Sequence, residues 1–412
     1  MLNYLIDYLL NFGFNPTISN LLNYISVRSA LAIIFSLFIT IYYGKHIIKI
    51  LNKKLVNDEI RDLGLLGQAE KNGTPTMGGI IILISVLIPT VLLCDLTNIY
   101  IIIMLITTFW MGLIGFVDDY IKVFKKNKKG LAGRFKILGQ TLLGIMVCVL
   151  MYNHDDIVIR ENLQKNQKYE NEIIYNLNNN TQYFGDSQKS LKTTIPFFKN
   201  NQLDYETLTG DGQKPLITFL LFAFIVVFII TAVSNSANLT DGIDGLATGC
   251  SAIIGATLGI FCYVSGNMVF ANYLDIMFIP NLSELVVFMS SFVGACVGFL
   301  WYNSYPAQVF MGDVGSLSIG GIIGVVSILI RKELLIPIFC GIFFIESLSV
   351  IIQVSYFKYT KRKFGQGVRI FKMSPIHHHF QKNGIHESKI VTRFWIICVF
   401  ICLLAFVTLK IR

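Results

Sequence analysis

Four polar side chains recur every third residue in the stretch NSANLTDGIDGL, residues 235–246. They are Asn235, Asn238, Asp241 and Asp244. A helical or 3₁₀ turn would place such residues roughly on one side, so that their oxygen atoms could converge on one ligand. The glycines beside the two aspartates would let that ligand approach the backbone closely. The alternative is an ordinary polar turn between two helices, because Asn, Asp and Gly are common turn residues.

The composition indicates where this stretch must work. Of the 412 residues, 54% are hydrophobic and only 14% are charged, and the mean hydropathy is +0.61. These values predict an integral membrane protein rather than two or three soluble domains. The eight cysteines lie mostly in apolar runs without metal-ligand spacing, so we interpret them as small buried hydrophobic side chains. The net charge of +9 could suit a nucleic acid, but the basic residues lie in short loops between apolar runs, which membrane orientation explains better.

The apolar runs are long enough to form transmembrane helices. A hydrocarbon core about 30 Å thick needs about 20 residues of apolar helix. We therefore predict an all-α polytopic membrane protein with about ten transmembrane helices. The predicted spans are 28–47, 78–94, 98–117, 136–152, 215–234, 247–266, 285–302, 315–331, 334–355 and 394–411. The N-terminal sequence MLNYLIDYLLNFGF lacks the basic region and cleavage site of a signal peptide, and we expect it to lie at the membrane interface.

Lysine and arginine are concentrated in the loops after the first, third and ninth predicted spans. Because basic loops stay in the cytoplasm, this distribution predicts that both termini are periplasmic. Residues 153–214 form a polar insertion between spans four and five, on the periplasmic side. A small subdomain and a partly disordered segment are both compatible with its composition, which favours disorder. We expect residues 1–412 to form a single membrane-embedded domain, and we assign the insertion no chemistry.

Two further acidic motifs fall on the face that the loop charges make cytoplasmic. Asp118 and Asp119 end the third predicted span, and Lys122 follows one turn later. Asp313 lies in a glycine-flanked turn between spans seven and eight. Adjacent carboxylates repel each other, so at the membrane edge they require a cation, a proton or a lysine. The alternatives are an aspartate pair that simply faces solvent and a single loop aspartate without a role.

Taken together, the loops after spans three, five and seven present carboxylates on one face. Oxygen ligands without cysteine favour Mg²⁺ or Mn²⁺ over zinc. Magnesium usually shares phosphate oxygens with one or two carboxylates, so a phosphate-containing substrate is implied. Basic residues beside these loops, including Lys71, Lys122 and Lys136, would hold a polyanion at the membrane surface.

The basic loop before the last span contains three consecutive histidines: His377, His378 and His379. Three residues in a row cannot share one helical face, so this run alone does not make a zinc site. Its functional interpretation is hydrogen bonding to an anionic substrate, and the alternative is that the histidines point to water. Ser374 and Pro375 fit an N-cap and a first helical position, which predicts a short helix here. Glu346, inside the ninth predicted span, is interpreted as a structural hydrogen-bond partner of a neighbouring helix.

These motifs closely resemble one family, the polyprenyl-phosphate N-acetylhexosamine-1-phosphate transferases. The resemblance covers almost the whole chain in order: NGTPTMGG at 72–79, GFVDDYIKV at 115–123, GRFKILGQ at 133–140, NLTDGIDGLA at 238–247, FMGDVGSL at 310–317, ESLSVIIQV at 346–354 and SPIHHHF at 374–380. The motifs are long and specific, and the triple histidine separates one branch of the family from relatives that use other amino sugars. The insertion at 153–214 is the one departure, on the side away from the expected site.

The resemblance implies transfer of phospho-MurNAc-pentapeptide from UDP-MurNAc-pentapeptide to undecaprenyl phosphate, with release of UMP and a requirement for Mg²⁺. It implies that Asp313 is a magnesium ligand and that Asp118 is the base that prepares the lipid phosphate for attack. Asp119 and Lys122 would support the lipid phosphate and the diphosphate of the donor.

The other matched positions belong to substrate binding. By resemblance, the four polar residues of 235–246 meet the nucleoside and the diphosphate, Phe310 lies near the uracil, and the three histidines bind substrate. Lys71, Thr76 and Lys136 also match family motif positions, with roles less defined. A homodimer is a further expectation from the family.

Two alternatives stay open at this point. A sister enzyme would transfer GlcNAc-1-phosphate or another amino-sugar phosphate to the same lipid. A polytopic transporter would also place polar residues at broken helices, but nearer the bilayer midplane and often within inverted repeats, which this sequence does not show.

Overall fold

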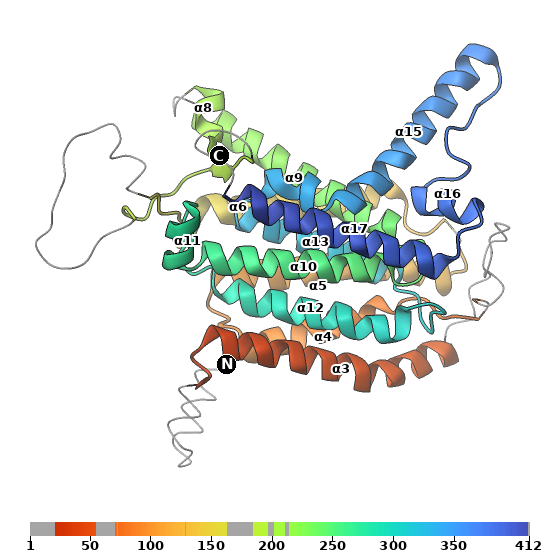
Figure 1. Ribbon diagram of the computed structural model, residues 1–412, viewed down its shortest axis with the longest axis horizontal. Coiled ribbons are helices and arrows are strands. Elements are labelled where there is room, and N and C mark those ends of the chain that lie inside the picture. Colours follow the sequence, from red (N-terminus) through yellow and green to blue (C-terminus); the bar gives the residue numbers. More distant parts are fainter. Residues whose placement is uncertain are drawn as a thin grey trace, which may run out of the picture.

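The structure is a computed structural model that describes residues 21–54, 71, 73–127, 129–162, 184–196, 202–210 and 214–410. The N-terminal segment expected at the membrane interface lies outside these residues. The described residues are mainly helical, with one two-stranded sheet, and most of the long helices run along a common axis (Figure 1).

Each of the ten predicted spans corresponds to a helix. These helices are α3 (Ile25–Lys54), α4 (Gly79–Leu93), α5 (Ile99–Val123), α6 (Gly133–Asn153), α9 (Pro215–Thr240), α10 (Leu246–Ser265), α12 (Glu284–Asn303), α13 (Gly312–Leu329), α15 (Gly341–Phe364) and α17 (Glu387–Thr408). Among the described residues, nine helices are long and apolar enough to cross a bilayer, whereas α4 has only 15 residues. The prediction of an all-α polytopic membrane protein is confirmed.

The ninth and tenth predicted spans differ most from the helices that form. The chain first makes the short elements η2 (Glu333–Leu335) and α14 (Ile336–Phe339), and α15 then continues well past the predicted end. The outer end of α15 stands away from the bundle (Figure 1). Helix α17 begins at Glu387 rather than 394, because the His386 side chain accepts a hydrogen bond from the Ser388 amide and caps the helix. Hydropathy therefore located the membrane segments but not the polar turns that extend them.

Helix α13 lies inside the bundle, against α4, α5, α9 and α10 (Figure 1). Every residue from Val314 to Leu329 is buried, as expected for a helix that is apolar on all faces. Its serines satisfy their hydroxyls within the helix, as when Ser318 donates to the Val314 carbonyl at 2.6 Å. Asp313 occupies the first turn of this central helix, so the packing of the core fixes its position.

The outer helices complete the bundle around this core. Helix α3 packs on α12 and α4, α6 packs on α9, and α17 packs on α10. All eight cysteines are buried and free, which confirms their interpretation as small hydrophobic side chains.

The described part of the 153–214 insertion folds against the end of α13 opposite Asp313. Strand β1 (Lys192–Thr194) pairs antiparallel with β2 (Gln202–Asp204), and the short helix α8 (Tyr205–Thr209) follows. The buried Lys332 ammonium donates to the Thr194 hydroxyl at 2.7 Å, and the Tyr205 hydroxyl donates to Glu333 at 3.0 Å. These buried contacts make the described part a small folded subdomain, a possibility that composition had ranked below disorder.

Candidate active site

Three carboxylates meet where α5 ends and α13 begins. Asp118 and Asp119 of α5 and Asp313 of α13 each offer an oxygen atom within 4.8 Å of the others. The Val314 amide donates to Asp119 at 3.0 Å and holds it in place. Gly312 has a φ of +72°, and a side chain on it would strike the Asp119 carboxylate, so this turn requires glycine.

Two lysines lie among these carboxylates. Lys122, one turn after Asp118 on α5, forms an ion pair with Asp118 and lies 3.2 Å from Asp313. Lys136 of α6 lies 3.0 Å from Asp118 and also pairs with Asp313. The structure thus brings together five of the residues predicted from sequence, and we call this set the acidic cluster: Asp118, Asp119, Asp313, Lys122 and Lys136.

The end of α9 adds polar groups to the acidic cluster. The Asn238 amide donates to Asp313 at 2.9 Å and to the Ser316 hydroxyl at 2.8 Å. Asn235 instead donates to the side-chain oxygen of Gln140 at 3.0 Å, so it supports α6 behind the cluster. Sequence reasoning missed Gln140, whose only signal was its place at the end of the GRFKILGQ motif.

Asp241 follows α9 and lies within the electrostatic field of the cluster. Burial, together with the nearby charges of Asp313 and Asp119, raises the pKa of Asp241 to about 8. The three carboxylates of the cluster outnumber its two ammonium groups. The resulting excess of negative charge and the oxygen-only donor set fit one hard divalent cation such as Mg²⁺.

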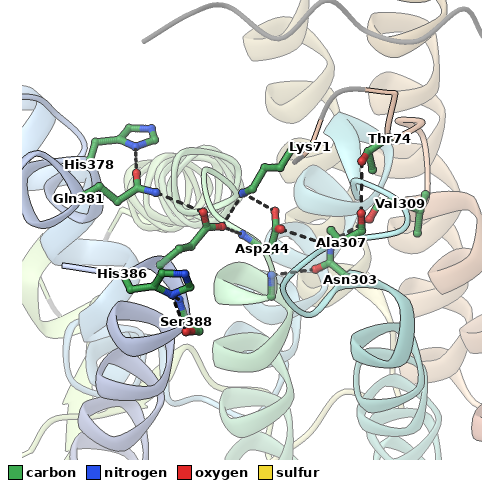
Figure 2. A network of polar contacts seen from close by, with 12 residues as sticks. Lys71, Thr74, Asp244, Asn303, Ala307, Val309, His378, Gln381, His386 and Ser388 are labelled. Atoms are coloured by element: carbon green, nitrogen blue, oxygen red, sulfur yellow. Dashed lines mark hydrogen bonds and ion pairs between the residues drawn. The ribbon is translucent and has the colours of Figure 1, made fainter. Parts of the chain in front are cut away.

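Asp244 does not join Asn238 and Asp241 of the 235–246 stretch beside the acidic cluster. Its carboxylate turns to Lys71, whose ammonium lies 2.7 Å away, and it accepts from the Ala307 amide at 3.0 Å (Figure 2). The expectation that all four polar residues converge is therefore wrong for Asp244, because α9 ends at Thr240 and the chain turns before α10. Lys71 likewise lies outside the acidic cluster.

Lys71 and Asp244 belong to a second group of polar side chains that extends to α17. Glu387 accepts from Lys71 at 2.6 Å, from the Asp244 amide at 2.6 Å and from Gln381 at 3.2 Å, and His378 contacts Gln381 at 2.7 Å (Figure 2). We call these five residues the Asp244 network: Lys71, Asp244, His378, Gln381 and Glu387. Sequence reasoning missed Glu387; its only signal was a carboxylate just after the histidine motif.

The three histidines lie on the short helix α16 (Ile376–Lys382) and point to different partners. His377 is buried, with its Nδ1 3.0 Å from the Glu346 carboxylate. His379 accepts from the Lys372 amide at 3.1 Å. The expectation that they share no common face is confirmed, and so is the expectation that Glu346 has a hydrogen-bond partner on a neighbouring helix, because its carboxylate lies at hydrogen-bond distance from His377 of α16. The predicted cap is off by one residue, since Pro375 is the N-cap.

His377 also touches the turn that carries Asp241. A Cβ on Gly242 would lie 2.2 Å from its Nε2, so only glycine allows this contact. That Nε2 is buried and has no hydrogen-bond partner among the described residues. Burial lowers the pKa of the next histidine, His378, to about 4, with the neighbouring His377 and Lys71 contributing, so His378 is neutral at pH 7.

The loop before Asp313 is held by the segment that contains Thr76. The Gly78 and Gly79 amides donate to the Phe310 and Met311 carbonyls at 2.8 Å, and the Phe310 amide donates to the Pro75 carbonyl at 2.8 Å. Thr76 lies beside Gly312, at the edge of the acidic cluster. The Phe310 ring is half-buried, and its expected position near a uracil stays a prediction.

The chain matches known proteins over the segments that build this site. Residues 101–331 match the model of glycosyl transferase family 4, and residues 71–83 match signature 1 of phospho-N-acetylmuramoyl-pentapeptide-transferase. The chain is 57%, 56% and 54% identical to the phospho-N-acetylmuramoyl-pentapeptide-transferases of Flavobacterium psychrophilum, Amoebophilus asiaticus and Flavobacterium johnsoniae, over the whole of each chain.

The chain belongs to the phospho-N-acetylmuramoyl-pentapeptide transferase family. The resemblance drawn from its motifs is thereby confirmed. Membership in this transferase family makes it a phospho-sugar transferase, and its apolar helices make it a multi-pass membrane protein. The two matches together span the acidic cluster, Thr76 and Lys71.

Proposed function

We propose that the protein transfers phospho-MurNAc-pentapeptide from UDP-MurNAc-pentapeptide to undecaprenyl phosphate, forming lipid I and UMP for peptidoglycan synthesis in the inner membrane. The observation that carries this proposal is the acidic cluster at the ends of membrane helices α5 and α13, in a chain of this family. A site of this kind can receive a lipid phosphate from the membrane and a nucleotide-sugar from water.

The acidic cluster supplies what phosphoryl transfer needs, which is mainly positioning and charge neutralisation. Asp118 accepts the proton of the lipid phosphate, whose oxygen then forms a bond to the sugar-bearing phosphorus while the bond to UMP breaks. Lys122 and Lys136 hold the phosphate oxygens, and Asp119 orients this end of the site through the Val314 amide. Mg²⁺, held by Asp313 with the neighbouring carboxylates, would neutralise charge on the diphosphate when bound.

The remaining predicted residues surround the donor. Asn238 near the end of α9 and Asp241 just after it line the approach to the diphosphate, Asn235 supports them through Gln140 of α6, and Phe310 stacks near the uracil. The triple histidine contacts the sugar side. We assign Lys71 and Asp244 to the wall of the donor site through the Asp244 network, rather than to the reacting phosphates.

We further propose that the acidic cluster faces the cytoplasm and that both termini are periplasmic. The support is the concentration of basic residues in the loops on the cluster's side of the membrane. A homodimer stays part of the proposal by family expectation, and the mass of the detergent-solubilised protein would test it.

One assay tests the activity directly. Purified protein should release UMP from UDP-MurNAc-pentapeptide in the presence of undecaprenyl phosphate and Mg²⁺, and removal of Mg²⁺ should stop the release. Equal or faster release from UDP-GlcNAc would favour the sister transferase instead. Mg²⁺-dependent UMP release also distinguishes a transferase from a transporter.

A second experiment tests the role of Asp118 as a base in a direct displacement. No phosphorylated enzyme should accumulate when the donor is supplied without the lipid. A stable aspartyl-phosphate, isolated after rapid quenching, would replace this mechanism with a two-step route.

A further inference from the structure

A second candidate site lies between the outer end of α15, the segment 369–374 and α16. It is a cavity of about 580 Å³, within the range of small-ligand sites. Its lining includes the cationic side chains of Lys358, Arg369, Lys372 and Lys382, and no acidic residue. No member of the acidic cluster lines it, so it is a separate site.

Hydrogen bonds from α15 hold the wall of this cavity in shape. The Gln353 side-chain oxygen accepts from the Ile370 and Phe371 amides at 3.1 and 2.9 Å, and its amide donates back to the Phe371 carbonyl at 3.3 Å. Two turns further out, the Thr360 hydroxyl accepts from the Val368 amide at 2.9 Å. The backbone of the returning segment is therefore fastened to α15 at two points.

Three of the four cations that line the cavity have no acidic partner in the part of the chain that the structure describes. Lys358, Arg369 and Lys372 form no ion pair with any residue that the structure describes, in contrast to Lys122 and Lys136 of the acidic cluster. These cationic residues are exposed at the open side of the cavity, and like charges gathered around one concave surface repel each other and attract an anion. Arginine and lysine together suit a carboxylate, which guanidinium groups bind through paired hydrogen bonds.

Helix α16 places this cavity next to the donor site. His377 of α16 touches Gly242 in the turn beside the acidic cluster, while Lys382 of the same helix lines the cavity. Helix α16 has seven residues and is therefore about 10 Å long. An extended pentapeptide spans about 17 Å, enough to pass this helix from a sugar held near the histidines.

We propose that the cavity binds the free carboxylate end of the donor's pentapeptide. This inference rests on the proposed function, because a pentapeptide joined to the sugar through its amino end carries a free carboxylate at its other end. Arg369 and Lys372 are the specificity-determining residues. They bind the terminal carboxylate, and so they favour a donor whose peptide is long enough to reach the cavity and ends in a negative charge. The reacting phosphates stay at the acidic cluster, which explains why the protein keeps two separate groups of cations.

The test compares two donors on full-length protein in nanodiscs. One is UDP-MurNAc-pentapeptide and the other is the same donor with its carboxylates amidated, and UMP release gives KM and kcat for each. The variants are Arg369→Gln and Lys372→Gln, with Lys361→Gln as the matched control, an exposed cation of α15 outside the cavity.

We expect the wild-type KM to be about tenfold higher for the amidated donor, with kcat nearly unchanged. Each cavity variant should raise KM about tenfold for the acidic donor and leave KM for the amidated donor unaltered, while Lys361→Gln should resemble wild type. A variant effect of the same size on both donors, or none on either, overturns the inference.

The same measurements distinguish a peptide carboxylate from a lipid headgroup as the occupant of the cavity. If the variant effects vanish in nanodiscs of neutral phosphatidylcholine and return with phosphatidylglycerol, whichever donor is used, the cavity binds a lipid headgroup and the inference is wrong. If wild-type protein uses both donors with the same KM, the inference is wrong but the proposed function stands. Wild-type protein that releases UMP from neither donor contradicts the proposed function, and the inference fails with it.

Discussion

The acidic cluster and the Asp244 network both combine carboxylates with lysine but differ in how their charges are satisfied. In the network, Asp244 and Glu387 share the Lys71 ammonium, and backbone amides and Gln381 occupy further carboxylate oxygens. In the cluster, three carboxylates crowd together, and Asp241 adds a fourth whose ionisation the others oppose. The carboxylates of the network are held by a lysine, backbone amides and Gln381, whereas the three crowded carboxylates of the cluster could also hold a metal ion.

From this difference we expect the network to act mainly on stability and the cluster mainly on activity. A buried charge with all partners in place holds distant segments together, and loss of one partner leaves the others unpaired. A group of like charges weakens the folded state and is retained where function needs it. The two regions should therefore respond in opposite ways to mutation and to pH.

The largest effect is expected from Asp118→Asn in the acidic cluster. It should lower kcat by about 1,000-fold or more, because the general base is lost, while thermal unfolding changes little. The rate of UMP release measures kcat, and a melting curve on the same preparation measures thermal stability. Asp156→Asn, a change at an exposed aspartate in the insertion, is the control. Activity within tenfold of wild type would remove Asp118 from the chemistry.

Asp244→Ala should act mainly on stability. It removes one of the two carboxylates that accept from the Lys71 ammonium and leaves the buried Ala307 amide without its acceptor, which should cost about 3 kcal/mol of unfolding free energy. Denaturant unfolding in detergent measures this loss, and Asp156→Ala should cost about 0.5 kcal/mol or less. If Asp244→Ala unfolds like wild type but has lost its activity, Asp244 belongs with the acidic cluster and the comparison fails.

The acidic cluster should make metal-free protein less stable as pH rises. The pKa of Asp241 is raised to about 8 in the folded state, so folding favours its protonated form. That contribution is present at low pH and is lost as pH rises through 8, by at most about 1.4 kcal/mol per pH unit. Melting curves in EDTA from pH 5 to 9 should show the decline, and Asp241→Asn should flatten it. Added Mg²⁺ should stabilise wild type more at pH 9 than at pH 6; a pH-independent gain would argue against a role for Asp241 near the metal.

His378 of the Asp244 network should give a smaller effect of the opposite sign. The pKa of His378 is lowered to about 4, so folding favours its neutral form. Its contribution is full above the ordinary histidine pKa of about 6.5 and is lost as pH falls toward 4. Between pH 7 and 4.5, the melting temperature of His378→Gln should fall less with decreasing pH than that of wild type. Identical curves would show that protonation of His378 is not linked to folding.

Much of the site could be predicted from the sequence because its residues lie in contiguous motifs at the ends of apolar runs. The Asp118–Asp119 pair and Asp313 were placed on one face by counting spans, and the structure brings them together. The same reasoning could not find Gln140 or Glu387, whose importance comes from contacts with segments far away in the chain. Helix ends were also missed, because α15 and α17 continue through polar residues that hydropathy assigns to loops.

The sequence by itself determined that this chain crosses a membrane about ten times and gathers its aspartates at helix ends, because hydrophobicity and charge are local properties that a bilayer sorts directly. Only the tertiary structure decided that residues spaced every third position divide between two groups. Asn238 and Asp241 serve the acidic cluster, while Asp244 turns to Lys71. The physical reason is that a carboxylate's role depends on the partners that packing brings to it, and those partners come from distant helices.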